Sequence, residues 1–378
     1  MEYILIIGTF ESIFLLLLLL GKKKKSLPDY LLGVIFMLYA ISIGSVYLEL
    51  QNIKNNPAYS AITNISWLFL FLHGPALWFY IKSLSDPEFR FKLLYLLHFI
   101  PFIFFSAFQY FNFISLTVPE KIAFLENDFF KEMVSYKITV LAIGVSTISY
   151  NTWALNLIRR RRERLMQQYS KIEDIDLGWL NVLTIAALIS YSVNVALFTL
   201  DLIFHFATYK YLMFLTNAFA TVYVLFLGYF GIRQGNIFIN NVTRTGRPGD
   251  ESPLNEPGSA VITADDDFIR TLSRKMEEKQ PYLDPEITVS RLSELLDVRV
   301  EFLSEVLNSR LNQNFFDFIN RYRVEEFKIQ SLLKANSHLS IMGIAYNCGF
   351  NSKASFYRAF KKFEGISPTA FIEMSHKK

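Results

Sequence analysis

The chain contains a series of long apolar stretches, and these constrain its fold more than any other feature. A helix that crosses a lipid bilayer needs about 20 mainly apolar residues, and its backbone polar groups have to be paired within the segment. The stretches of suitable length are Tyr3–Leu20, Tyr30–Glu49, Ala61–Ile81, Leu93–Phe113, Tyr136–Ile158, Trp179–Phe204 and Tyr211–Ile232. Hydrophobic residues make up 52% of the sequence, which is above the usual share of a soluble domain. The sequence therefore predicts a seven-helix transmembrane bundle.

The charges between these stretches predict how the bundle is oriented. Short loops on the cytoplasmic side of a membrane carry an excess of Lys and Arg. Basic clusters occur in every second connection, namely Lys22–Lys25, Lys82–Lys92 and Arg159–Arg164. The other connections, which we expect to be external, are Gln51–Ser60, Ile114–Ser135 and His205–Lys210. Seven crossings then place the N-terminus outside and the C-terminus in the cytoplasm.

The first apolar stretch differs from a signal peptide in the position of its charges. A signal peptide carries its positive residues before the apolar core, whereas Lys22–Lys25 come directly after Tyr3–Leu20. We therefore expect the first stretch to remain as an uncleaved span with its lysines in the cytoplasm.

A few polar residues lie inside the predicted spans. Asn194 and Asp201 are seven residues apart and so share one face of the sixth span, with Tyr191 nearby, while His73 precedes a Gly-Pro pair in the third. Polar groups within a bilayer are costly and usually face the bundle interior or water. Two readings stay open: the four side chains form a ligand pocket, or they make hydrogen bonds between helices. For Asp201, proximity to the outer interface is a further explanation.

A change in composition separates the spans from the rest of the chain. Gln234–Ala264 is rich in Gly, Pro, Ser and Asn and has no apolar period, which is typical of a flexible linker. We therefore expect three parts: residues 1–233 as the membrane domain, 234–264 as the linker and 265–378 as a separate domain.

The C-terminal part contains a helix, a glycine turn and a basic helix. Ser340 is suited to cap the first helix, and Gly349 tolerates the backbone of a tight turn. In the second helix, Phe356, Phe360 and Phe363 recur at helical spacing and predict one buried face. This order is the pattern of a helix-turn-helix, whose second helix enters the major groove of DNA.

The same segment resembles a known family. The run GF-x-S-x-x-x-F-x-R-x-F-K-K-x-x-G-x-S-P, from Gly349 to Pro368, is similar to the C-terminal signature of the AraC/XylS family of bacterial transcription regulators. The resemblance extends over roughly Asp265–Lys378. It implies an all-α domain with two helix-turn-helix motifs on one connecting helix, so that a single chain engages two adjacent major grooves.

The residues before Ser340 fit that arrangement. Val289–Leu296 and Glu301–Ser309 are predicted to form the first motif, and Asn314–Lys334 to form the connecting helix. Ahead of them, Asp265–Lys279 is predicted to be a helix that serves as a dimer contact or as a cap on the domain. We slightly favour the cap, because its apolar stripe is narrow and short.

The polar residues of the two motifs are candidates for DNA contacts. Those expected to meet phosphates are Arg299, Arg358, Lys361 and Lys362. Those expected to reach base edges are Ser304, Asn308, Asn351, Ser352, Lys353 and Ser355, and Tyr357 completes the set. The alternative is that these side chains only form solvated faces. This alternative has more weight in the first motif, where Glu301 and Glu305 oppose phosphate approach.

Catalytic motifs are absent from the sequence, and its five histidines are scattered. We therefore expect no enzyme activity, no cofactor and no metal. The single cysteine, Cys348, excludes an intrachain disulfide and is read as a small buried residue, with a redox switch as the less favoured alternative.

These observations together predict a membrane-bound one-component transcription regulator in the bacterial inner membrane. Its partners would be double-stranded DNA, membrane lipid and a small-molecule, lipid or protein signal, with a homodimer left open. In the alternative hypotheses, the spans form a transporter subunit with a regulatory tail, or serve only as a membrane anchor.

Overall fold

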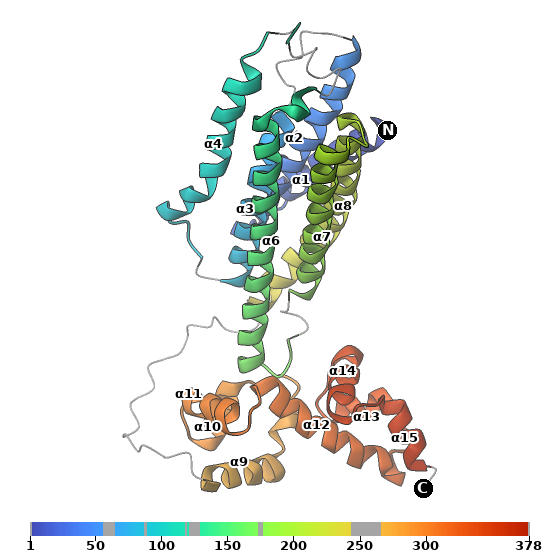
Figure 1. The fold of residues 1–378 in the computed structure, drawn as a ribbon. Helices are drawn as coiled ribbons and strands as arrows, with labels where there is room; N and C mark the ends of the chain where they lie inside the picture. Colours follow the sequence, from blue (N-terminus) through green and yellow to red (C-terminus); the bar gives the residue numbers. More distant parts are fainter. Residues whose placement is uncertain are drawn as a thin grey trace. The chain divides into compact units, whose positions relative to one another are not determined.

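The computed structural model describes residues 2–55, 65–86, 89–117, 119–120, 129–172, 177–242 and 266–376. Its elements within these ranges are helices, apart from one isolated bridge between Tyr169 and Thr288 (Figure 1). The expected all-α fold is therefore confirmed. The chain divides into two compact units. The first contains Met1–Arg159 and Leu177–Arg247, and the second contains Arg160–Asp176 and Pro248–Lys378.

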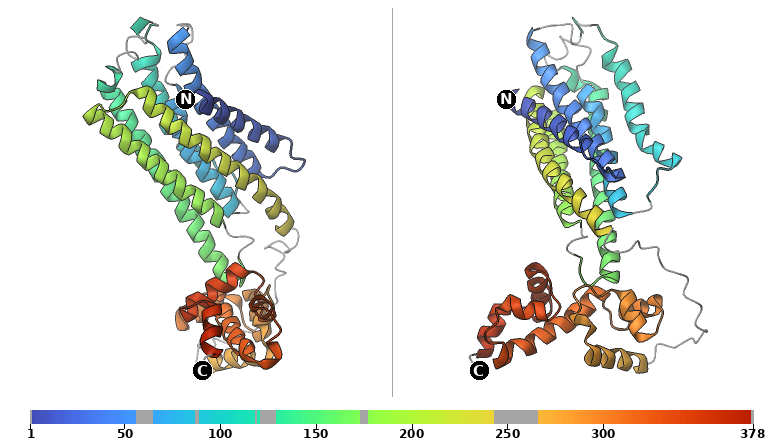
Figure 2. Two further views of the ribbon diagram at one scale, coloured as in Figure 1. Left: turned by 90° about the vertical axis from the view of Figure 1, so that its right-hand side faces the viewer. Right: turned by 180° about the vertical axis from the view of Figure 1, so that it is seen from behind.

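The first unit is a bundle of long helices that lie side by side (Figures 1 and 2). Its α-helices are α1 (Glu2–Leu20), α2 (Leu27–Asn55), α3 (Ile65–Ser85), α4 (Ile100–Gln109), α6 (Val134–Gln168), α7 (Gly178–Phe204) and α8 (Tyr209–Val242). The shorter turns are η2 (Leu93–Phe99), η3 (Tyr110–Ile114) and η4 (Phe129–Glu132). Two helix ends differ from expectation. α6 runs on into the second unit, and α8 continues to Val242, so that residues 234–242 of the predicted linker are helical. The rest of that linker, residues 243–264, lies outside the described residues.

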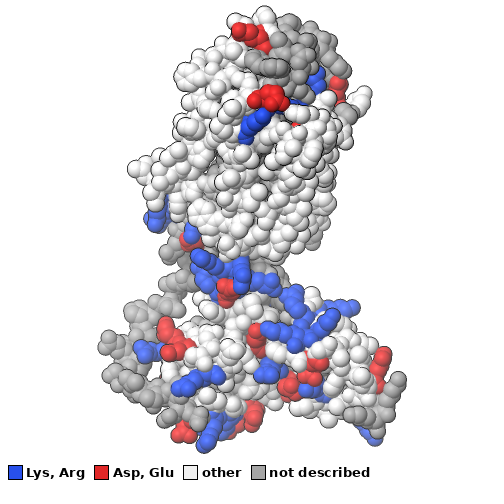
Figure 3. Space-filling model, viewed as in Figure 1, with Lys and Arg blue, Asp and Glu red and all other residues white. Residues whose placement is uncertain are grey.

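The outer surface of the bundle is apolar. Large side chains such as Phe10, Val182 and Ile189 are more than half exposed. Soluble proteins rarely expose such extended apolar surface to water. Most of the bundle face seen in Figure 3 carries no charged side chain. Six helical segments in the described part of the chain are long and apolar enough to cross a membrane. They are Glu2–Leu20, Leu27–Glu49, Leu93–Ile114, Val134–Gln168, Gly178–Phe204 and Tyr209–Ile232.

The third predicted span is not one of those six, so the count of seven is not confirmed. It corresponds to α3, whose mean hydropathy is reduced by His73, Pro75 and Lys82. Its predicted first residues, 61–64, lie outside the described ranges. Nevertheless α3 is enclosed by its neighbours, since Trp67 and Phe71 are buried along with most of the residues that follow.

Close helix packing in the bundle depends on glycine. A Cβ atom on Gly8 of α1 would lie 2.2 Å from the Thr221 hydroxyl oxygen on α8, and one on Gly228 of α8 would lie 2.4 Å from a Leu15 methyl on α1. Helices in a membrane associate through such small residues, because lipid provides little hydrophobic drive between them.

The second unit contains two helix-turn-helix motifs on a shared helix. The first motif is formed by α10 (Val289–Leu296) and α11 (Val300–Glu305), and the second by α13 (Ile341–Asn347) and α14 (Lys353–Glu364). The shared helix is α12 (Phe315–Leu332). The remaining elements are α9 (Asp266–Lys279), η5 (Pro281–Leu283), η6 (Val306–Arg310), η7 (Lys334–Asn336) and α15 (Pro368–His376).

Helix α12 contributes to two separate hydrophobic cores. Phe318 and Ile319 belong to the core of the first motif, whereas Val324 and Phe327 belong to that of the second. Each motif is therefore a small domain in its own right, and α12 bridges them as predicted. Helix α9 packs onto the first core through Phe268, with its ring centroid 4.9 Å from that of Phe302. This placement fits the cap reading of α9.

Candidate functional site

Helix α14 has one face fixed in the core and another open to solvent. Phe356 and Phe360 are fully buried, with ring centroids 4.6 and 5.6 Å from that of Phe327 on α12. At its start, the Ser352 hydroxyl accepts a hydrogen bond from the Ser355 backbone amide at 3.1 Å. At its end, Gly365 adopts a left-handed conformation with φ of 76°. These contacts fix which side chains of α14 point outward.

Gly349 makes the turn before α14 possible. Its φ of 88° is strained for any residue with a side chain. A Cβ atom here would also lie 2.3 Å from the Tyr282 carbonyl oxygen and 3.0 Å from Arg323 Nε. The second motif therefore packs against the residues before the first motif through bare backbone.

The outward face of α14 is basic. Lys353, Arg358, Lys361 and Lys362 are exposed, and Tyr357 is partly exposed. Lys353 Nζ lies 5.5 Å from the centroid of the Tyr357 ring, within range of a cation–π contact. Lys362 Nζ forms an ion pair with Asp317 Oδ2 of α12 at 2.6 Å, so a phosphate at this point would have to compete with a carboxylate.

Three predicted base-reading residues at the start of α14 are less available than expected. Asn351 and Ser352 are partly buried, and the Ser352 hydroxyl is occupied by its capping bond. Ser355 is only 5% exposed. The expectation that Ser355 faces outward is therefore not met, because position 355 lies beside Phe356 on the packed side of the helix.

The first motif presents a mixed surface. Arg299 precedes α11 as its N-cap and is exposed, together with Asn308. Ser304 is partly exposed, and its carbonyl oxygen accepts a hydrogen bond from the Asn308 side chain at 2.8 Å. Glu301 and Glu305 are exposed on the same short helix. Positive charge is thus concentrated in the second motif.

The bundle contains a cavity of about 50 Å³, whose wall is mostly apolar with several polar groups. Its walls come from α2, α3, α7 and α8, and the polar residues among them are Tyr39, Ser42, His73, Ser190, Tyr191, Asn194, Thr216, Asn217 and Tyr223. Of the four residues predicted to bind a ligand, the structure brings His73, Tyr191 and Asn194 to this cavity.

A chain of hydrogen bonds runs along the cavity wall. The two ring nitrogens of His73 pair with the Ser42 and Tyr191 hydroxyls, each at 3.1 Å. Tyr191 Oη in turn lies 3.3 Å from Tyr39 Oη. The Tyr223 hydroxyl oxygen is also buried and has no hydrogen-bond partner among the described residues. A buried hydroxyl in that state is costly, and a polar molecule in the cavity could bond to it.

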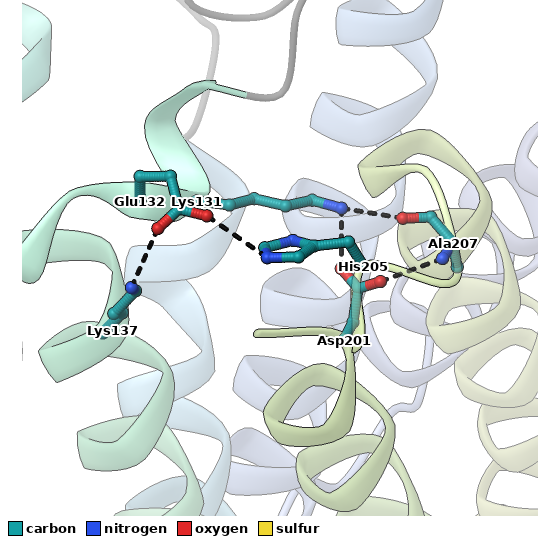
Figure 4. Close-up of polar contacts among 6 residues, drawn as sticks. All are labelled: Lys131, Glu132, Lys137, Asp201, His205 and Ala207. Carbon is teal, nitrogen blue, oxygen red and sulfur yellow. Dashed lines mark hydrogen bonds and ion pairs between the residues drawn. The ribbon is translucent and has the colours of Figure 1, made fainter. Parts of the chain in front are cut away.

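Asp201 lies elsewhere, in a separate ion-paired cluster at one end of the bundle (Figure 4). Its Oδ2 atom accepts a hydrogen bond from Lys131 Nζ at 2.6 Å, and its Oδ1 atom accepts one from the Ala207 amide at 2.9 Å. His205, which ends α7 with φ of 48°, lies 3.4 Å from Glu132 in the same cluster. The structure gives Asp201 a role in fixing the α7–α8 turn against η4.

Sequence reasoning missed part of the cavity wall. Ser42, Thr216 and Asn217 are polar residues within predicted spans, so the criterion that selected Asn194 could have found them. Thr216 donates a hydrogen bond to Asn194 Oδ1 at 2.7 Å. Tyr39 and Tyr223 gave no such signal, because tyrosines occur throughout the spans.

No group of three or more His, Cys, Asp or Glu side chains within the described ranges could hold a metal ion. In the comparison with known families, residues 292–374 match a family model described as a helix-turn-helix domain. The match extends from α10 to α15 and identifies an AraC-type module at the C-terminal end of the chain. No curated protein and no solved structure matches the chain. The matched module supports DNA binding and transcription regulation.

Proposed function

We propose that this protein is a membrane-bound one-component transcription regulator, in which a signal sensed by the helical bundle controls DNA binding by the C-terminal module. One observation carries the proposal: an AraC-type helix-turn-helix module and an apolar bundle with an internal cavity occur in a single chain. Regulation of genes by such a chain requires the module to lie in the cytoplasm.

The proposed topology has seven spans, with α3 as a central helix. A helix that is shielded from lipid by its neighbours can be less apolar than one that faces lipid, and Trp67 and Phe71 of α3 are buried. With α3 included, the basic clusters at Lys22–Lys25 and Arg159–Arg164 fall on the cytoplasmic side. The N-terminus then lies on the outer side of the bacterial inner membrane, and the module lies in the cytoplasm.

The proposed DNA contacts are divided between the two motifs. Arg358, Lys361 and Lys362 of the second motif meet phosphates, and Lys353 and Tyr357 lie beside them on the exposed face. In the first motif, Arg299 would meet phosphate, while Ser304 and Asn308 would reach base edges, as would Asn351 in the second. We leave out Ser355, because it is buried. The second motif thus supplies most of the affinity, and the first contributes mainly to discrimination.

The proposed sensory site is the cavity at His73, Tyr191 and Asn194. Its volume of about 50 Å³ admits only a molecule of a few non-hydrogen atoms, and its hydroxyl and amide groups favour one that forms hydrogen bonds. Such a ligand can shift the protein only by binding two of its states with different affinity. The cavity walls come from four helices, so a change in their packing would alter both the cavity and the ends of those helices.

Filling the cavity tests the sensory role. Ala187 of α7 lines the cavity and is buried, whereas its neighbour Ala186 is exposed on the outer face of the same helix. Ala187→Leu should abolish the response of the regulated genes to growth conditions, while chromatin immunoprecipitation still finds the protein at its promoters. Ala186→Leu should respond as the wild type does. A normal response in Ala187→Leu would contradict the sensory role and favour a simple membrane anchor.

A further inference from the structure

The connection between α6 and α7 includes a segment that packs within the DNA-binding unit. Residues Arg160–Asp176 belong to that unit, and within them Tyr169 and Ser170 make the contacts considered below. We call Tyr169–Ser170 the strap. It directly follows Gln168, the last residue of α6, and residues 171–177 connect it to Gly178, the first residue of α7.

The strap lies against the residues that lead into the first helix-turn-helix. Tyr169 forms an isolated antiparallel bridge with Thr288, the N-cap of α10. The Ser170 hydroxyl donates a hydrogen bond to the Ile287 carbonyl oxygen at 2.8 Å, and the Ser170 amide donates to the same oxygen at 3.4 Å. Ser170 is only 1% exposed, so these bonds are shielded from water.

Two buried residues of α12 complete the binding site of the strap. Arg323 Nη2 donates a hydrogen bond to Ser170 Oγ at 3.3 Å, and Asn320 Nδ2 donates to the Ser170 carbonyl oxygen at 3.4 Å. Asn320 is fully buried and Arg323 is 2% exposed. A buried guanidinium is stable only when its donors are paired, so each acceptor around Arg323 contributes to holding it there.

Arg323 also links the two helix-turn-helix motifs. Its Nε atom donates to the Tyr282 carbonyl oxygen at 2.7 Å, and Nη2 donates to that of Asp284 at 2.8 Å, both ahead of the first motif. Its guanidinium carbon lies 5.8 Å from the ring centroid of Phe350, in the turn of the second motif. The strap therefore joins a junction at which both motifs meet α12.

We propose that the strap is an intramolecular effector of the DNA-binding unit, which stabilises the Arg323 junction and so holds the two motifs in the arrangement that binds DNA. This inference rests on the proposed function and adds its route of regulation. Two helix-turn-helix motifs on one chain lose less conformational entropy on binding adjacent grooves when their relative orientation is fixed before binding. A change in the bundle that withdraws the strap would then weaken DNA binding.

Removal of the Ser170 hydroxyl tests this directly. The full chain is purified in membrane-like nanodiscs, and the probe is a duplex selected by that chain from a random library. Ser170→Ala should raise the Kd for the duplex about threefold to tenfold, because two hydrogen bonds of the junction are lost. The matched control is Gln168→Ala, an exposed residue at the end of α6, which should leave the Kd unchanged.

A reversible cross-link tests the same contact without removing Ser170. Residues that face each other across an antiparallel bridge are close enough for a disulfide, so Tyr169→Cys with Thr288→Cys should cross-link on oxidation. Tyr169→Cys with the exposed Asn308→Cys is the control pair. Oxidation of the first pair should keep the Kd at or below the value of its reduced form, and adding Ser170→Ala should then have no effect on the oxidised protein.

The possible outcomes distinguish failure of this inference from failure of the proposed function. If the wild-type chain binds the duplex and Ser170→Ala binds it equally well or more tightly, the effector role is wrong. Failure of the bridge pair to cross-link above the control pair would also overturn it. If the wild-type chain selects no duplex at all, it is the proposed function that fails.

Discussion

At the scale of single residues, two glycines of the second motif allow a matched comparison. Gly349 has a positive φ and no room for a Cβ, whereas a Cβ on Gly343 in α13 would have its nearest contact at 3.4 Å. Gly349→Ala should destabilise the second motif by about 1–3 kcal/mol, from the strained backbone and the clash. Gly343→Ala should stabilise it by about 0.5–1 kcal/mol, because alanine is the better helix former. Hydrogen exchange of the α13 and α14 amides in the full chain measures both, and a change of the same sign in the two variants would contradict this account.

Cys348 supplies a second prediction at this scale. Burial, with a smaller contribution from the negative charge of Glu326, raises the pKa of the Cys348 thiol to about 12. The thiolate is the reactive form, so native Cys348 should react very slowly with iodoacetamide at pH 8, and denatured protein should react quickly. The pKa of this thiol is higher in the folded state than in the unfolded state. Its contribution to the stability of the folded state is therefore complete below about pH 9 and is lost as the pH rises from about 9 to 12.

The alkylation experiment distinguishes a buried residue from a redox switch. Mass spectrometry after timed labelling gives the rate, and Gly349→Ala should increase it because local opening exposes the thiol. Rapid labelling of native wild-type protein at pH 8 would show instead that Cys348 is accessible and ionised.

Residue identity alone could not predict every contact. The positions of Phe356 and Phe360 followed from helical spacing, and both are buried as expected. Ser355 is adjacent to them and polar, so its burial depends on how α14 is rotated against the rest of its domain. Asp201 shares a helix face with Asn194, but it lies two turns away and pairs with Lys131 from another segment. Spacing along one helix predicts which residues share a face, but it does not predict which other segment packs against that face.

At the scale of elements, α14 and α11 are expected to differ in their contribution to affinity. Arg358→Ala should weaken binding to DNA about uniformly across sequences and reduce the salt slope of log K by about 1, since one phosphate contact is lost. Arg299→Ala should have a smaller effect on both quantities, because Glu301 and Glu305 lie near it. Lys279→Ala, exposed at the end of α9, is the control. Electrophoretic mobility shifts over a range of salt concentrations give the slopes, and equal effects of Arg358→Ala and Arg299→Ala would rule out the proposed division of roles.

The elements themselves were largely predictable, and their limits were less so. Both helix-turn-helix motifs and the connecting helix lie where spacing and capping residues placed them. The exceptions have tertiary causes. Helix α3 contains His73, Pro75 and Lys82, and only its enclosed position makes these tolerable in a proposed span. The strap could not be recognised at all, because Tyr169 and Ser170 have no pattern of their own and are placed by Arg323 and Asn320 far along the chain.

At the scale of the whole molecule, we propose that one chain is embedded in the inner membrane and binds DNA on the cytoplasmic side. The direct measurement is binding of a labelled, selected duplex to membrane vesicles that contain the full chain. Inverted vesicles expose the cytoplasmic face and should bind the duplex, whereas right-side-out vesicles should not. A variant that combines Lys353→Ala, Arg358→Ala and Lys361→Ala should lose binding in inverted vesicles at an equal protein level. Binding confined to right-side-out vesicles, or none in inverted vesicles that contain the wild-type chain, would contradict the account.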